Sequence, residues 1–250
     1  MGNSKFNVKE YSKKYDTHRA ADMRLVEKVI DKLEITETKK ILDFGCGTGN
    51  YLEALKLKGY SNLFGLDPSE DMRKIAFEKT ALTIKDGSHL NIPYEDNFFD
   101  AVFLINSIHF IDDLKALFNN LQRVCKKDAS IFIATQSRKL MKNRFYNKYF
   151  PSLLEIDYKR YHEIEKIVST AQQSGFSLRS NHDFINGTDM PIDKEYFSLV
   201  QNKAFSIFAL LPEDEFNKGI SLFKEDMKDG GFVAKFAGYT IIILQKNNES

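Results

Sequence analysis

The sequence has little of what marks several special classes of protein. Only two of its 250 residues are cysteines, and its formal net charge is +1. Two cysteines do not suggest a disulfide framework, and they do not offer the paired Cys/His spacing of a zinc site. A net charge this close to zero gives no global reason to expect binding to nucleic acid or to a membrane surface.

Long apolar runs, internal repeats and low-complexity tracts are also missing. No apolar run approaches membrane-spanning length, and Met1–Tyr15 is too polar and charged for a signal peptide. We therefore expect a cytoplasmic protein with no membrane partner and no metal, present as a monomer or a homodimer. The composition, 42% hydrophobic and 28% charged residues, is ordinary for a globular protein, and the length fits one α/β domain with an insertion.

The stretch Lys40–Asn50, with the sequence KILDFGCGTGN, is the most informative part of the chain. Its mostly apolar start predicts a buried strand, three glycines follow at Gly45, Gly47 and Gly49, and an amphipathic pattern then predicts a helix. Glycines allow a positive φ and let the backbone approach a ligand closely. The start of a helix offers free N–H groups to a polar or anionic group. A tight strand–helix turn without a ligand is the alternative.

The glycine spacing separates two kinds of nucleotide ligand. A dinucleotide fingerprint, G-x-G-x-x-G, would have its third glycine where Asn50 stands. Asp43 adds a carboxylate at the end of the strand, which suits a cationic ligand better than a pyrophosphate. An NAD-dependent oxidoreductase is therefore the weakest of the alternatives.

Strand and helix patterns alternate along the chain, which predicts an α/β fold with a doubly wound, mostly parallel sheet. Beyond the first strand, strands are expected at 62–67, 81–85, 98–106, 130–135, 176–184 and 239–245. Helices are expected at 17–33, from Ser69 onward, at 112–124 and at 161–174. Residues 8–34 are expected to form an N-terminal helical lid, and residues 187–238, with helical patterns of their own, an inserted helical cap.

Polar residues stand at the ends of four predicted strands: Asp43, Asp67, Asp86 and Asn106. In open parallel sheets, ligands bind outside the carboxyl ends of the strands, where the strand order reverses. An acid about twenty residues after the glycine turn, as Asp67 is, can accept hydrogen bonds from both hydroxyls of a ribose. Each residue alone is more often a cap or a turn residue, but four at one sheet edge favour a ligand site.

These motifs resemble those of the class I S-adenosylmethionine-dependent methyltransferases. The resemblance extends over roughly residues 38–136 and is closest to the small-molecule branch related to the ubiquinone and menaquinone biosynthesis enzymes. The matching motifs are Ile41–Asn50, Gly65–Ser69, Lys85–Gly87, Asn91–Pro93, Phe98–Val102 and Leu121–Val124. The resemblance implies a Rossmann-like, seven-stranded sheet whose last strand, 239–245, is antiparallel. It also implies S-adenosylmethionine as the methyl donor and S-adenosylhomocysteine as the product.

The same resemblance implies which residues bind the donor. They are Asp43, Gly45, Cys46, Gly47, Gly49, Asp67, Pro68, Met72, Asp86, Gly87 and Asn106, with Tyr11 and Tyr15 closing over the donor. Asp43 is expected near the methionine ammonium, Asp67 at the ribose and Asp86 at the adenine amino group. Met72 is expected to pack on the adenine, and Asn106 to line the floor under the sulfonium. For the two tyrosines, packing within the protein is an equal alternative.

Methyl transfer requires few catalytic side chains from the protein. The sulfonium already activates the methyl group, so in-line attack requires proximity and orientation in a dry pocket. A base is needed only where the acceptor must lose a proton, and His109, just past the strand at 98–106, is the best-placed candidate. A histidine that only orients its loop is the alternative. The expected acceptor is a small organic molecule, for which the aromatic residues of the cap form either a pocket wall or merely the core of the cap.

Residues 138–150 favour a different acceptor. Basic residues there alternate with aromatic ones: Arg138, Lys139, Lys142, Arg144 and Lys148 with Phe145, Tyr146, Tyr149 and Phe150. Such a run suits single-stranded nucleic acid or an acidic substrate, although it is more commonly a solvated helix face. An RNA-directed methyltransferase is therefore one alternative, with nucleic acid not the expected partner. A non-catalytic, methyltransferase-like interaction module is another.

Overall fold

The computed structural model describes residues 20–247. Within that range the chain forms two compact units. The first comprises residues 20–135, 164–182 and 241–247, and the second comprises residues 136–163 and 183–240. None of the helices in these residues has the length and apolar character that crossing a membrane requires.

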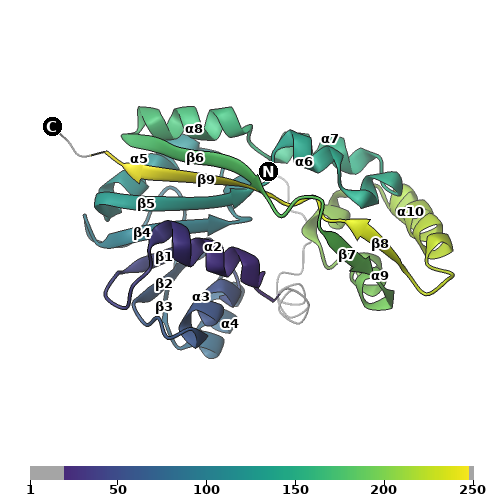
Figure 1. Ribbon diagram of the computed structural model, residues 1–250, viewed down its shortest axis with the longest axis horizontal. Helices are drawn as coiled ribbons and strands as arrows, with labels where there is room; N and C mark the ends of the chain where they lie inside the picture. The colour runs from purple at the N-terminus through teal and green to yellow at the C-terminus, as the bar shows by residue number, and fades with distance from the viewer. Residues whose placement is uncertain (1–19, 248–250) are drawn as a thin grey trace. The chain divides into compact units, whose positions relative to one another are not determined.

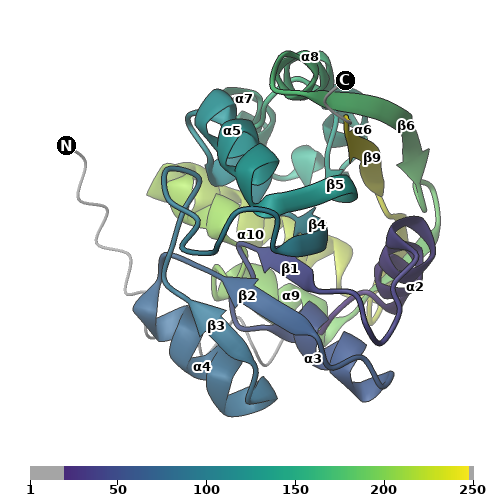
Figure 2. The same cartoon turned by 90° about the vertical axis from the view of Figure 1, so that its left-hand side faces the viewer.

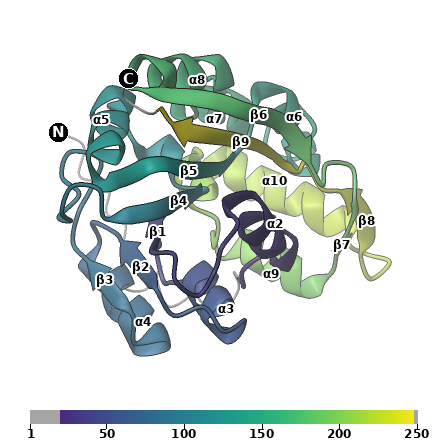
Figure 3. The same ribbon diagram turned by 60° about the vertical axis from the view of Figure 1, so that its left-hand side comes forward.

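A seven-stranded sheet dominates the first unit. Its strand order is β3–β2–β1–β4–β5–β9–β6 (Figure 2). The strands are β1 (Ile41–Phe44), β2 (Leu63–Leu66), β3 (Thr83–Lys85), β4 (Phe99–Ile105), β5 (Cys125–Thr135), β6 (Phe176–Phe184) and β9 (Tyr239–Lys246). β1 to β5 pair in parallel, whereas β9 runs against its neighbours (Figure 3). The predicted sheet, mostly parallel with an antiparallel last strand, is confirmed.

The strand order reverses beside β1, which lies at the centre of the sheet. β1 pairs with β2 on one side and with β4 on the other, and all four of its residues are buried. The register aligns Phe44 with Leu66, and Leu66 with Lys85. β1, β2 and β3 therefore end level with one another, so the residues that follow them begin at one edge of the sheet.

Helices pack on the sheet of the first unit in two groups. α5 (Leu114–Val124) packs on α8 (Ile164–Gln173), and their apolar faces share one core with alternate residues of β1, β2 and β4. The second group is α2 (Met23–Leu33), α3 (Asn50–Leu57) and α4 (Glu70–Thr80) (Figure 1). The Ser69 hydroxyl accepts a hydrogen bond from the Met72 N–H and so caps the start of α4.

Several boundaries differ from the sequence expectation because of caps and turns. α2 begins only at Met23, since the Asp22 side chain caps it by accepting from the Arg24 N–H. Ala81 adopts a left-handed conformation at the end of α4, which delays β3 to Thr83. The short helix η1 (Ile108–Phe110) follows β4.

The second unit has its own aromatic core. Its elements are α6 (Arg138–Lys142), η2 (Phe145–Lys148), α7 (Ser152–Arg160), β7 (Asp189–Ile192), α9 (Lys194–Gln201), η3 (Ser206–Leu210), α10 (Glu213–Asp226) and β8 (Phe232–Lys235). β7 and β8 form a two-stranded antiparallel sheet (Figure 3). Phe150, Phe208 and Phe223 are completely buried. Residues 136–163 thus share one core with helices of the 187–238 segment, which the alternation of strands and helices does not indicate.

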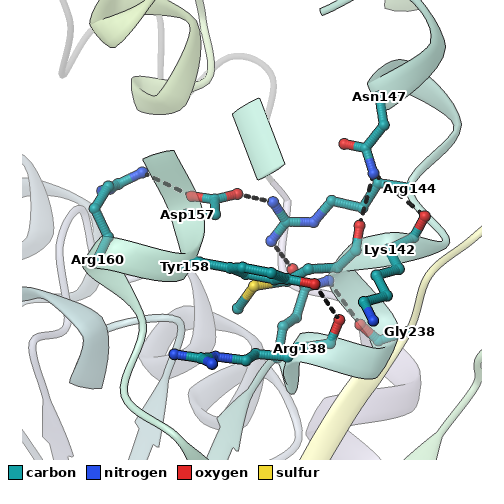
Figure 4. Close-up of polar contacts among 10 residues, drawn as sticks. Arg138, Lys142, Arg144, Asn147, Asp157, Tyr158, Arg160 and Gly238 are labelled. Atoms are coloured by element: carbon teal, nitrogen blue, oxygen red, sulfur yellow. Dashed lines mark hydrogen bonds and ion pairs between the residues drawn. The ribbon is translucent and has the colours of Figure 1, made fainter. Parts of the chain in front are cut away.

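The basic and aromatic residues of the 138–150 run are used to build this unit. Tyr149 stacks on Phe223 with ring centroids 4.6 Å apart, and Phe150 lies in the core. The Arg144 guanidinium donates to the Asp157 carboxylate, to which Arg160 also donates (Figure 4). Three of the other four cations form ion pairs as well: Arg138 with Glu163, Lys139 with Asp183, and Lys148 with Asp226. Packing and ion pairing within the unit therefore account for most residues of the pattern that favoured a single-stranded nucleic acid.

Candidate functional site

The three glycines of the turn after β1 differ in the space beside them. Gly45, Gly47 and Gly49 all have a positive φ, from 54° to 78°. A Cβ on Gly45 would lie 2.6 Å from the Cβ of Ser107, and one on Gly49 would lie 3.1 Å from that of Ala76. A Cβ on Gly47 would meet nothing within 4 Å. Close packing therefore explains Gly45 and Gly49, whereas Gly47 leaves open space beside the backbone just before α3.

Asp67, which follows β2, is tied to this turn. Its Oδ2 accepts from the Gly47 N–H at 2.9 Å, and its Oδ1 accepts from the Ser69 N–H at 2.8 Å. Burial raises the pKa of the Asp67 carboxyl, an effect that the two N–H donors and the Arg73 guanidinium oppose. Each carboxylate oxygen has a second acceptor position. Asp67 can thus hold the turn in place and still accept hydrogen bonds from a ligand.

Asp43, inside β1, gives the site a second buried carboxyl. It is 3% exposed, and burial together with the charge of Asp67 raises its pKa well above the usual value. Burial and the charges of Asp43 and Asp67 also raise the pKa of the Cys46 thiol, which keeps it protonated and unreactive. A cationic ligand group would relieve the repulsion between the two acids, so the electrostatics favour such a group.

Asp86 and Gly87 follow β3 and differ in exposure. The Asp86 side chain is 72% exposed, and its Oδ1 accepts from Arg73 Nη1 at 2.9 Å. A Cβ on Gly87 would lie 2.5 Å from the Leu66 Cδ1 atom and 2.8 Å from the Asn91 carbonyl oxygen. Gly87 is therefore required by the close approach of the loop to β2, whatever it does for a ligand.

The end of β4 brings three further residues to this edge. Asn106 has a φ of 52°, an uncommon value for a residue other than glycine, and its N–H donates to the Ala134 carbonyl at 2.9 Å. The Ser107 hydroxyl donates to the Phe44 carbonyl at 2.8 Å, which ties the end of β4 to the end of β1. His109 lies in η1, half-buried, with its ring centroid 4.1 Å from that of Phe110.

The remaining predicted site residues are less closely tied to the turn. Met72 is half-buried in the first turn of α4, and Pro68 is exposed just before that helix. Tyr11 and Tyr15 lie outside the described residues.

Two residues of this edge were missed by the sequence reasoning. Thr48, in the glycine turn, is 1% exposed, and its hydroxyl has no hydrogen-bond partner among the described residues. An unpartnered buried hydroxyl is costly, so a polar ligand that reaches it would gain a hydrogen bond at no expense to the fold. Arg73 donates to the Asp67 carbonyl and to the Asp86 carboxylate, both at 2.9 Å. The x positions of the G-x-G-x-G motif point to Thr48, but no sequence signal identifies Arg73.

A nucleoside with a cationic extension fits these groups. Asp67 supplies acceptors for hydroxyls, Gly47 leaves space beside the backbone, and Thr48 holds an unused hydroxyl. The buried carboxyls favour a positive charge rather than a phosphate.

Comparisons with known proteins agree with this description. Residues 42–133 match the family model described as a methyltransferase domain. An uncharacterized protein of Methanocaldococcus jannaschii is 35% identical over 137 residues, which is 52% of each chain. The demethylmenaquinone methyltransferase of Staphylococcus epidermidis is 26% identical over 160 residues, which cover 60% of this chain and 66% of that enzyme. The chain thus spans about half to just under two thirds of the length of these curated relatives.

The fold is shared with a solved structure over most of the chain. A protein of Anabaena variabilis, described as a methyltransferase from an antibiotic biosynthesis pathway, superposes with a TM-score of 0.74. The superposition covers 91% of this chain and 98% of that protein, at 23% sequence identity.

Proposed function

Because the chain belongs to the class I S-adenosylmethionine-dependent methyltransferase family and is related to the menaquinone biosynthesis enzymes, we propose that it transfers the methyl group of S-adenosylmethionine to a small organic acceptor. The observation that carries the proposal is the junction of Gly47 with Asp67. There the open side of the glycine turn lies against a buried carboxylate that has acceptor positions left for a ribose.

The residues of the sheet edge divide among the parts of the donor. Asp67 accepts from the ribose hydroxyls, and Asp43 lies near the methionine ammonium. Met72, Asp86 and Gly87 bind the adenine, and Asn106 lines the floor under the sulfonium. The glycine turn with Cys46 faces the methionine moiety, Pro68 borders the ribose, and Tyr11 and Tyr15 close over the donor. In support of this assignment, β1, β2 and β3 end level with one another, so the residues that follow them start from the same edge of the sheet.

The protein contributes mainly position and a proton acceptor. S-adenosylmethionine, when bound, supplies a methyl group that its positive sulfur already activates. The residues of the edge then hold the donor and exclude water, so that an acceptor can attack in line. His109 takes the proton of an acceptor that must lose one. Its position just past β4, beside the proposed floor residue Asn106, supports this role.

An acceptor with an apolar part is favoured. Phe110 and Leu90, which follow β4 and β3, are each 66% exposed. Large exposed apolar side chains in the segments that follow these strands are candidates for contact with an apolar substrate. The name of the staphylococcal relatives refers to a quinone, so demethylated quinones are the first acceptors to screen.

Thermal unfolding with added ligands tests the donor. A ligand at a hundred times its dissociation constant adds about 2.7 kcal/mol, which raises the midpoint by a few degrees. We expect a rise with S-adenosylmethionine and with S-adenosylhomocysteine, and none with NAD. The Asp67→Ala variant should unfold cooperatively but lose most of the rise, because losing a charged hydrogen-bond partner costs about 1.5–3 kcal/mol. No rise with any of the three would favour the non-catalytic interaction module.

A further inference from the structure

Arg73 joins the ends of two strands at the proposed donor site. It lies in the first turn of α4, and its side chain is 19% exposed. Its Nη1 donates both to the main-chain carbonyl of Asp67 and to Oδ1 of Asp86, each at 2.9 Å. One guanidinium therefore fixes the first residue after β2 against the first residue after β3.

We infer that Arg73 is a positioning residue for the adenosine of the donor, which it serves by holding the Asp67 carboxylate ionised and in place. The inference rests on the proposed function, because it concerns the residue assigned to the ribose. It goes beyond the family motifs, since none of the motifs named above includes position 73.

The contacts of Asp67 show why an arginine is needed there. Both carboxylate oxygens already accept backbone N–H groups, from Gly47 and Ser69, so their direction is set. The N–H of Asp67 donates to the Lys85 carbonyl, and the carbonyl of Asp67 accepts from Arg73. Among the described contacts of Asp67 and its neighbours, two side chains tie the segment between β2 and α4 to that helix: Ser69, which caps it, and Arg73. Without Arg73, only the Ser69 cap would remain of these two.

The charges around Asp67 are otherwise acidic. Asp43 faces it from β1 and Asp86 from the end of β3, while Cys46 in the turn stays protonated. Burial and the charge of Asp86 raise the pKa of Asp67, and the charge of Arg73 lowers it, together with the N–H groups of Ser69 and Gly47. An ionised Asp67 accepts two ribose hydroxyls, whereas a protonated one must donate its own hydrogen, so the charge state decides how well adenosine binds.

The test is calorimetric titration of S-adenosylhomocysteine into full-length variants from about pH 4.5, close to the usual pKa of an aspartate, up to about pH 8.5. For Arg73→Met we expect binding about tenfold weaker at the low end, as expected for loss of a charged partner. The deficit should shrink as pH rises, because Asp67 ionises at the higher pH. Arg73→Lys keeps the positive charge and should retain most of the affinity with no new pH dependence.

Lys74→Met is the matched control, since Lys74 is the next residue on α4, is 64% exposed and pairs with Glu70. It should bind like the wild type at every pH. A deficit in Arg73→Met that is the same at all pH values, or no deficit at all, would overturn the inference. Carbon-13 NMR titration of Asp67 in the ligand-free protein gives a second readout, in which the midpoint should be higher in Arg73→Met than in the wild type.

The two readouts separate this inference from the proposed function. If the wild type binds no adenosyl ligand, the proposed function fails, and with it the role of Arg73 toward adenosine. If the wild type binds and Arg73→Met binds equally well with an unchanged Asp67 midpoint, only the positioning role fails.

Discussion

Gly45 and Ser107 approach so closely that a Cβ on Gly45 would lie 2.6 Å from the Ser107 Cβ. The contact joins the turn after β1 to the end of β4, where the Ser107 hydroxyl also donates to the Phe44 carbonyl at 2.8 Å. The glycine turn is therefore part of the packing of the sheet edge as well as a proposed ligand site.

Comparing Gly45→Ala with Gly47→Ala separates these two roles. Gly45→Ala adds strain and a clash with Ser107, so we expect a loss of about 2–3 kcal/mol in the free energy of unfolding. Gly47→Ala meets no neighbour and should lose only about 1 kcal/mol, yet it places a methyl group where the donor is proposed to bind. Urea unfolding and titration with S-adenosylhomocysteine measure the two effects. Normal donor binding by Gly47→Ala would contradict the assignment of this turn.

Asp43→Asn should make the ligand-free protein more stable at pH 7. The folded-state pKa of Asp43 lies well above the unfolded value near 4, so the folded protein keeps a proton that the unfolded chain releases. The stabilisation from this group is complete below about pH 4 and is lost as pH rises through the folded pKa. Asparagine cannot ionise, so the variant should be more stable than the wild type at pH 7, and this advantage should vanish toward about pH 4.

Urea unfolding across that pH range measures the advantage of Asp43→Asn. The same variant should bind S-adenosylmethionine more weakly than the wild type, because asparagine cannot release a proton and become negative when the ammonium binds. A variant less stable than the wild type at pH 7 would show that the buried carboxylate is well compensated.

His109→Ala tests the proposed base. With an acceptor found by screening, turnover should fall about a hundredfold, while affinity for S-adenosylhomocysteine stays the same. His89→Gln is the control, because His89 lies on the loop after β3, where its Nε2 is 2.7 Å from the Asp112 carboxylate. Undiminished turnover in His109→Ala would mean that the acceptor reacts without a base.

Asp157→Asn should selectively destabilise the second unit. The Arg144 and Asp157 side chains are 8% and 2% exposed, and burial of one partner without the other typically costs about 3–5 kcal/mol. Asp226→Asn removes a more exposed ion pair with Lys148 and should destabilise the unit much less. Hydrogen exchange would detect the loss as faster exchange in α7. Equal effects of the two substitutions would show that Arg144 finds another partner.

The sequence predicted the sheet well because its signals are local. Apolar runs such as 98–106 and glycines at alternate positions report on their own residues, and the strand ends follow from them. The contacts that organise the site are not local. Arg73 reaches Asp86 across 13 positions and Ser107 reaches Phe44 across 63, and no periodicity carries either relationship.

The 138–150 run shows the same limit. Its composition is common to a nucleic-acid surface and to a compact unit with buried rings. The difference lies in distant partners, Asp157 and Asp226 for the cations and Phe223 for Tyr149. A sequence read segment by segment does not bring these partners together.

Both cores contain residues from late in the chain, and this sets an order of events during synthesis. The second unit combines 136–163 with 183–240, and β9 contributes Ile242 and Leu244 to the core of the first. When Phe150 leaves the ribosome, its partners Phe208 and Phe216 have not been made. Aromatic rings and strand edges therefore stay exposed to solvent until their partners have been synthesised. A nascent chain aggregates most readily in that state. Chaperone demand should accordingly peak before the last strand emerges, and a shortened chain without β9 should leave the core of the first unit incomplete.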